Sequence, residues 1–136
     1  MWLENPYFIA IGIPVALLLS GAMAKKLVRG STWKRQDFFL GVEFTLAAMS
    51  AALVFIFDLV AANQTGSNPV SPREYAETGS FLATTFFLLL WIMSTHQDWE
   101  PRNDDPRAQI IWLGVIANLV GAGLLVAFVL LVKGVT

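Results

Sequence analysis

The sequence predicts an all-α membrane protein, built as a bundle of four transmembrane helices within a single domain, 1–136. Four apolar stretches carry this prediction: Tyr7–Ala24, Phe38–Val60, Ser80–Ser94 and Ile110–Val132. A helix needs about 20 mostly apolar residues to cross a hydrocarbon core of ~30 Å. Only 14% of the 136 residues are charged, whereas a typical soluble domain has about 25%. We therefore expect an integral, multi-pass protein of a plasma membrane or a bacterial inner membrane.

Local capping signals set the expected ends of the helices. Asn5-Pro6 is typical of an N-cap followed by proline at the first helical position. Gly30 is expected to end the first helix in a left-handed conformation, and Ser31 or Thr32 to cap the second. Ser71 and Glu74 fit a capping box, and Asp105-Pro106 repeats the signal of Asn5-Pro6. The predicted helices are 6–29, 32–61, 72–96 and 106–133.

The distribution of lysine and arginine predicts the orientation in the membrane. Seven of these residues fall in the two connections at one end of the predicted bundle, and two fall at the other end. The seven are Lys25, Lys26, Arg29, Lys34, Arg35, Arg102 and Arg107, and the two are Arg73 and Lys133. Since positive charge is retained on the cytoplasmic side, we expect both termini to be extracytoplasmic.

Glu43 and Asn118 are the polar residues expected at membrane depth. A carboxylate inside a membrane helix normally faces protein or a water-filled cavity, because insertion into lipid is unfavourable. Glu43 and Asn118 are expected at similar depths in the second and fourth helices. We therefore expect them to share a polar cluster, joined by Ser20. The alternative is that each side chain only holds neighbouring helices together.

One face of the second helix is less apolar than any other helical face. Glu43, Ser50 and Asp58 follow helical spacing along it, together with Ala47 and Val54. A pore-lining helix has this pattern, and so does a packing face of small residues. Near the outer end, Arg73 or Lys133 is available to pair with Asp58.

Small residues recur at four-residue spacing and predict close helix contacts. The first helix carries Gly12, Ala16, Ser20 and Ala24 on one face, and similar faces occur in the second and fourth helices. Such faces allow backbones to approach closely in lipid. Their number exceeds what four helices need, which favours a homo-oligomer.

The connection between the third and fourth helices is a candidate docking surface. Its charged and aromatic residues are Asp98, Trp99, Glu100, Arg102, Asp104 and Asp105. A cytosolic protein partner is one interpretation, and a solvated connection is the other. The basic connection beside it is expected to attract anionic lipid head groups. The net charge of −1 gives no basic face for nucleic acid.

No motif for catalysis, metal binding or cofactor binding is present. The chain has no cysteine and one histidine, so thiolate and paired-histidine metal sites are excluded. We expect no enzymatic activity, cofactor or metal. The first hypothesis is a homo-oligomeric ion channel or pore-forming protein controlled from its cytoplasmic loops. The alternatives are a non-transporting membrane subunit or scaffold that recruits a cytosolic partner, and a proton-coupled transporter that uses Glu43.

Overall fold

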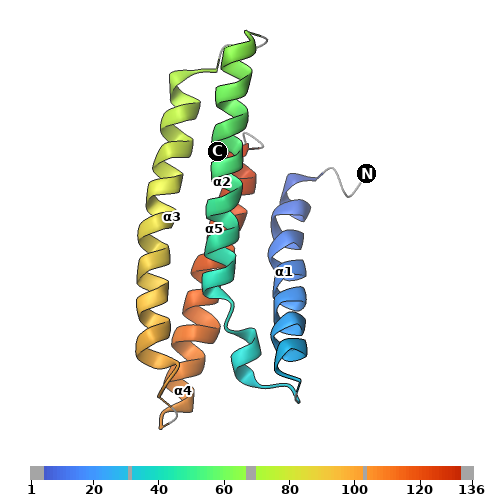
Figure 1. The fold of residues 1–136 in the computed structure, drawn as a ribbon, viewed down its shortest axis with the longest axis vertical. Coiled ribbons are helices and arrows are strands. Elements are labelled where there is room, and N and C mark those ends of the chain that lie inside the picture. The colour runs from blue at the N-terminus through green and yellow to red at the C-terminus, as the bar shows by residue number, and fades with distance from the viewer. Residues whose placement is uncertain (1–4, 31, 67–69, 103, 133–136) are drawn as a thin grey trace.

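The computed structural model describes residues 5–30, 32–66, 70–102 and 104–132, and within them it contains helices and turns but no strands. Figure 1 shows the arrangement. The elements are α1 (Pro6–Arg29), the short 3₁₀ helix η2 (Arg35–Phe38), α2 (Gly41–Thr65), α3 (Pro72–Trp99), α4 (Pro106–Gln109), the π-helical segment η3 (Ile110–Ile116) and α5 (Ala117–Val132).

Four helical segments are long and apolar enough to cross a membrane. They are Tyr7–Arg29, Arg35–Thr65, Pro72–Trp99 and Pro106–Val132. The prediction of an all-helical fold with four such segments is confirmed at this level. The last segment is one continuous helical run, in which α4, η3 and α5 follow each other without a break.

Four of the eight predicted helix ends, at residues 6, 29, 72 and 106, are confirmed by their capping contacts. The Asn5 side chain accepts a hydrogen bond from the Tyr7 backbone N–H at the start of α1. Gly30 ends α1 with a φ of 68°, a left-handed value that glycine adopts without strain. Ser71 and Glu74 form the expected capping box at the start of α3. Asp105 caps α4 by accepting from the Ala108 N–H.

The predicted start of the second helix at residue 32 is wrong. The helix α2 begins at Gly41, and the chain before it forms η2 and an extended turn. Ser31, one of the two expected caps, lies outside the described residues. The helix also continues to Thr65 and ends at Gly66 rather than at residue 61. Likewise, α3 continues to Trp99 rather than ending at residue 96, and the predicted end at residue 133 lies outside the described residues. The physical reason for the late start is a set of side chains from other helices, described below.

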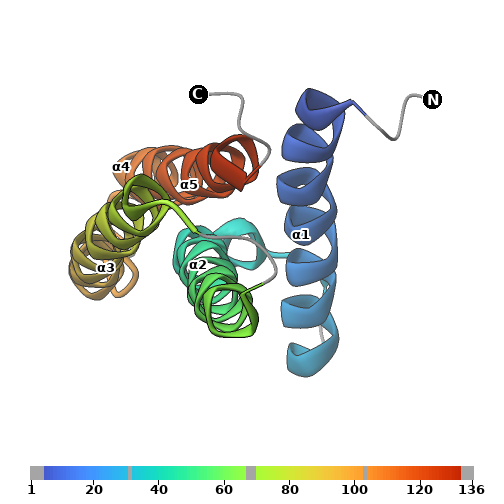
Figure 2. The same cartoon turned by 90° about the horizontal axis from the view of Figure 1, so that it is seen from above.

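The helices α2, α3 and α5 form one group, and α1 lies beside it (Figures 1 and 2). The contacts of α1 are mainly with α5 and η2, and it contacts α2 little. Its first turn and the last turn of α5 point toward the end of the bundle that holds the α2–α3 connection. The opposite end holds the lysine- and arginine-rich connections.

The helices α2 and α5 pack closely against each other, and a glycine of each helix lies at the contact. A Cβ atom added at Gly41 would lie 2.7 Å from the backbone carbon of Ala117, and one added at Gly121 would lie 2.7 Å from Phe44 Cβ. The buried cluster around this crossing contains Ala22, Leu40, Phe44, Ala48, Leu124 and Leu125. The N-terminal end of α2 at Gly41, called its inner end because it faces the bundle end with the lysine- and arginine-rich connections, is therefore fixed against α5. The half of α2 toward Thr65 is called its outer half.

Candidate functional site

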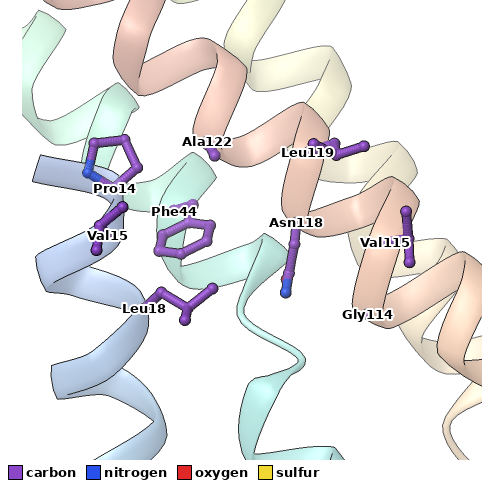
Figure 3. Close-up of a pocket in the computed structure, with 9 residues that line it drawn as sticks. All are labelled: Pro14, Val15, Leu18, Phe44, Gly114, Val115, Asn118, Leu119 and Ala122. Carbon is purple, nitrogen blue, oxygen red and sulfur yellow. The ribbon is translucent and has the colours of Figure 1, made fainter. Parts of the chain in front are cut away.

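The backbone before α2 is held by the side chain of Asn118 from α5. Its Oδ1 accepts from the Leu40 N–H at 2.8 Å, and its Nδ2 donates to the Phe38 carbonyl at 2.6 Å. A non-helical backbone inside a membrane needs such partners, because lipid offers none. Asn118 thus permits α2 to begin at Gly41, and Figure 3 shows it pointing toward this part of the chain.

An ion pair between Arg29 and Asp37 holds η2 against the end of α1. The two guanidinium nitrogens of Arg29 lie 2.6 and 2.8 Å from the two carboxylate oxygens of Asp37. The same carboxylate accepts from the Lys34 N–H at 2.8 Å. Asp37 is 1% exposed, so this bidentate pair is a structural element of the turn.

Glu43 pairs with Lys25 from α1. The Lys25 Nζ lies 2.6 Å from Glu43 Oε1 and donates to the Phe39 carbonyl at 2.7 Å. The pair joins α1 to the first turn of α2. The Glu43 side chain remains 45% exposed, so this ion pair lies at the surface of a single chain.

The predicted polar cluster of Glu43, Asn118 and Ser20 does not form. Glu43 bonds to Lys25, whereas Asn118 bonds to the backbone at Phe38 and Leu40. The Ser20 hydroxyl donates to the Ala16 carbonyl of its own helix. The physical reason is that the interrupted backbone before α2 offers Asn118 an unpaired N–H and an unpaired carbonyl. Both polar residues nevertheless stabilise the same segment, residues 38–43.

The polar stripe of α2 faces away from the interior of the single chain. Its members Glu43, Ser50 and Asp58 are all exposed, and Ala47 is half-buried. The opposite face is buried and contains Phe44, Thr45, Ala48, Ala52 and Leu59. The stripe is therefore not the face by which α2 packs within one chain.

Ser50 and Asp58 make no hydrogen bond or ion pair in the part of the chain that the structure describes. Arg73, one of the two expected partners of Asp58, instead pairs with Glu77 on its own helix at 2.5 Å. Lys133, the other, lies outside the described residues. Within residues 5–132 as described, both polar groups thus lie on the exposed face of α2 without a partner.

A shallow groove of about 390 Å³ runs beside this stripe. It lies between the outer half of α2 and the end of α5. Its lining residues are Ser50, Ala51, Val54, Phe55, Asp58, Phe128 and Val132. The polar side chains therefore border a concave surface rather than a flat one.

The connection between α3 and α4 is tied down by aromatic and amide contacts. Trp99 stacks on Trp112 of η3 at 6.2 Å between ring centroids, and Arg102 lies over Trp99 at 5.0 Å. The buried amide of Gln109 donates to the carbonyls of Trp99 and Glu100. This leaves the end of α3 fixed on the start of α4.

The predicted docking residues have different surroundings within this connection. Asp98, Glu100, Arg102, Asp104 and Asp105 are exposed, and Trp99 is half-buried. Glu100 lies 3.5 Å from the His96 ring, and Asp105 is used as a helix cap. Asp98 and Asp104 have no hydrogen-bond or ion-pair partner among the described residues.

Among all the residues that the structure describes, no group of three or more His, Asp or Glu side chains is arranged to hold a metal ion. The ion pairs are instead one-to-one.

An apolar groove of about 370 Å³ separates α1 from α5 (Figure 3). Pro14, Val15 and Leu18 line it from α1, and Phe44 lines it from α2. The wall on the other side consists of Gly114, Val115, Asn118, Leu119 and Ala122. Since Val15 and Leu119 are more than half exposed, the groove is open at the surface of the bundle.

Sequence reasoning missed the roles of Lys25, Arg29 and Asp37. The sequence indicates Lys25 and Arg29 only as topology signals and as part of a lipid-attracting connection, and it places Asp37 within a predicted helix. Asp37 follows Arg29 by eight residues, with a helix-ending glycine between them. This spacing allows an ion pair across a turn, but many carboxylates have such a spacing, so the sequence alone does not identify the pair. Comparison with known proteins adds no assignment, because no family, curated protein or solved structure matches this chain.

Proposed function

We propose that the protein is a homo-oligomeric ion channel or pore-forming protein, with a path lined by the exposed face of α2. One observation carries the proposal. Glu43, Ser50 and Asp58 lie on the face of α2 that a single chain leaves uncovered. Polar side chains within a membrane normally face protein or water rather than lipid. Assembly of several copies around this face would provide that environment.

The small-residue face of α1 supports assembly. Gly12, Ala16, Ser20 and Ala24 are all exposed in the single chain. A Cβ atom added at Gly12 would meet nothing within 4 Å. Small side chains on a helix surface permit close packing against another membrane helix. We propose that this face contacts a neighbouring copy and turns the stripe of α2 toward the assembly axis.

The Lys25–Glu43 pair lies where a control point of such a path is expected. It joins α1 to α2 at the end of the bundle that holds most of the lysine and arginine residues. By the charge rule for membrane topology, this end is cytoplasmic. We propose that movement of α1 relative to α2 opens the pair and exposes the Glu43 carboxylate to permeating cations.

The test is ion flux through liposomes that contain the purified protein. Ser50→Leu replaces an exposed hydroxyl with a bulky apolar side chain and should abolish flux while the protein still folds. Phe87→Leu, at an exposed position of α3 and therefore off this face, is the control and should conduct like the wild type. Absence of flux in the wild type under voltage, calcium and pH gradients would refute the proposal.

A proton-coupled transporter is distinguished by the same measurement. Flux would then saturate with substrate and follow the proton gradient. The single variant Glu43→Gln is a poor test, since it leaves Lys25 without its carboxylate. The double variant Lys25→Gln/Glu43→Gln removes both charges, and loss of all pH-driven uptake in it would favour the transporter.

The scaffold hypothesis has one observation of its own. Asp98 and Asp104 are exposed and unpaired on a connection held by Trp99, Trp112 and Gln109. A fixed acidic surface of this kind suits a basic cytosolic partner. Reversal of both charges to lysine should abolish capture of such a partner, whereas Ser50→Leu should leave capture intact.

A further inference from the structure

The basic residues of the α1–α2 connection fall into two groups in the structure. Lys25 and Arg29 are engaged by Glu43 and Asp37. Lys26, Lys34 and Arg35 have no ion-pair partner in the portion of the chain described, and the latter two are exposed. Three cations at one edge of the bundle therefore remain available to an external anion.

Aromatic rings lie beside these cations. The Lys26 Nζ is 4.6 Å from the centre of the Trp33 ring, and Trp33 stacks on Phe38 with centroids 5.6 Å apart. Trp33 is 47% exposed. Tryptophan and lysine together are typical of the membrane interface, where the ring contacts acyl chains near the head groups.

The apolar groove between α1 and α5 ends near Phe38, the residue that stacks on Trp33. Pro14 and Leu18 line the groove from α1. Ala22, one turn closer to Lys26, is 1% exposed and packs in the core with Leu40, so the groove does not continue along α1 beyond Leu18. At its inner end, Asn118 bonds to Phe38, and the Phe39 ring would lie 3.2 Å from a Cβ atom added at Gly114. The groove thus ends at η2, next to the Trp33–Phe38 stack.

The spacing matches the length of one lipid leaflet. Leu18 and Pro14 precede Lys26 by eight and twelve residues, which corresponds to about 12 and 18 Å along the helix. Half of the hydrocarbon core is about 15 Å. A lipid whose phosphate contacts Lys26 would therefore have an acyl chain long enough to reach the groove by passing over η2.

We propose that this surface binds one anionic phospholipid of the adjacent leaflet. Lys26, Lys34 and Arg35 hold the phosphate-containing head group, Trp33 and Phe38 support the glycerol region, and the α1–α5 groove takes one acyl chain. The occupant is a lipid rather than a free phosphate, because exposed aromatic rings lie beside the cations and an apolar groove ends near the same Phe38. This inference does not depend on the channel proposal, since a scaffold or a transporter would carry the same site.

The experiment compares phosphatidylglycerol with phosphatidylcholine of identical acyl chains. Retention of each lipid is measured by native mass spectrometry, and the melting temperature is measured with each lipid added. The wild type should retain phosphatidylglycerol preferentially and melt at a higher temperature with it. Lys26→Gln/Lys34→Gln/Arg35→Gln should remove the preference, at about five-fold in affinity for each cation. Glycerophosphoglycerol, the head group without chains, should not compete.

Two matched controls separate the site from general charge and general lipid contact. Arg73→Gln/Arg102→Gln/Arg107→Gln removes the same charge elsewhere and should keep the preference. Val15→Trp fills the groove from an exposed position and should lower the retention of both lipids. Phe87→Trp, on the exposed face of α3, should not.

Three results would overturn the proposal. The first is equal retention of both lipids by the wild type. The second is an equal loss of the preference for phosphatidylglycerol in the two triple variants, which would mean that the total positive charge of the protein, and not one site, attracts the lipid. The third is unchanged lipid retention in Val15→Trp, which would remove the groove from the site.

Discussion

The two ends of α2 differ in how their polar groups are matched. At the inner end, Asn118 bonds to the backbone before the helix, and Lys25 pairs with Glu43. In the outer half, Ser50 and Asp58 have no partner among the described residues. Polar groups that are hydrogen-bonded or ion-paired within the chain stabilise its fold. Polar groups without such a partner, on a face exposed within a membrane, need water or another protein chain beside them. The comparison therefore separates residues that hold the fold from residues that are candidates for function.

The largest expected effect of a substitution is at Asn118. Asn118→Leu removes the partners of the Phe38 carbonyl and the Leu40 N–H together. Each buried backbone group left unpaired costs about 1–3 kcal/mol. The free energy of unfolding in mixed micelles should fall by roughly the sum of two such terms. Wild-type stability of this variant would mean that the turn before α2 does not need Asn118, and Leu119→Ala on the exposed neighbour is the control.

The next largest effect is at the close contact between α2 and α5. Gly121→Ala would place a methyl group 2.7 Å from Phe44 Cβ, and overpacking of this kind costs about 1–3 kcal/mol. Gly123→Ala has nothing within 4 Å of its new Cβ and should stabilise the helix by about 0.5–1 kcal/mol. Equal melting temperatures for the two variants would contradict the described crossing.

The ion pair at the inner end should contribute less to stability. Lys25 and Glu43 are both partly exposed, with side-chain exposures of 36% and 45%, so the pair is worth about 0.2–1 kcal/mol. Lys25→Gln should destabilise more than Glu43→Gln, because it also removes the bond to the Phe39 carbonyl. A double-mutant cycle on the unfolding free energy measures the coupling, and a coupling of zero would contradict a stabilising role for the pair.

The smallest effects on stability are expected in the outer half of α2. Asp58→Asn and Ser50→Ala remove exposed groups without partners, so unfolding free energies should change by less than about 0.5 kcal/mol. Flux through liposomes should nevertheless fall in Asp58→Asn, because a cation-attracting charge is lost. A large loss of stability in either variant would mean that Ser50 or Asp58 has a structural partner, and would contradict the claim that the outer half of α2 does not hold the fold together.

The helix ends that the sequence predicts well are those set by neighbouring residues. Asn5, Gly30 and Asp105 act within a few positions of the termini they cap, so their spacing is sufficient evidence. The start of α2 depends on Asn118, which is 78 residues from Leu40. No local pattern indicates a partner so far along the chain, and for that reason the sequence predicts residues 32–40 as helix.

The sequence predicts which residues share the polar face of α2, but not whether that face is buried or exposed in the folded chain. Helical spacing places Glu43, Ser50 and Asp58 on one face, and the structure agrees that they share it. The sequence does not decide whether that face packs inward, because small and polar residues suit both environments. The pairing of Asp37 with Arg29 was also hidden, since the turn that brings them together exists only when the second helix begins late.

The most direct test of the account uses the absence of cysteine from the chain. Ser50→Cys introduces a single thiol on the stripe of α2, and Phe87→Cys introduces one on the exposed face of α3. Both proteins are reconstituted in liposomes and treated with a membrane-impermeant thiosulfonate reagent. A path lined by α2 predicts rapid modification of Ser50→Cys with loss of flux, and no modification of Phe87→Cys. If the two thiols are equally unreactive in folded, reconstituted protein, the stripe does not face water and the proposed path is wrong.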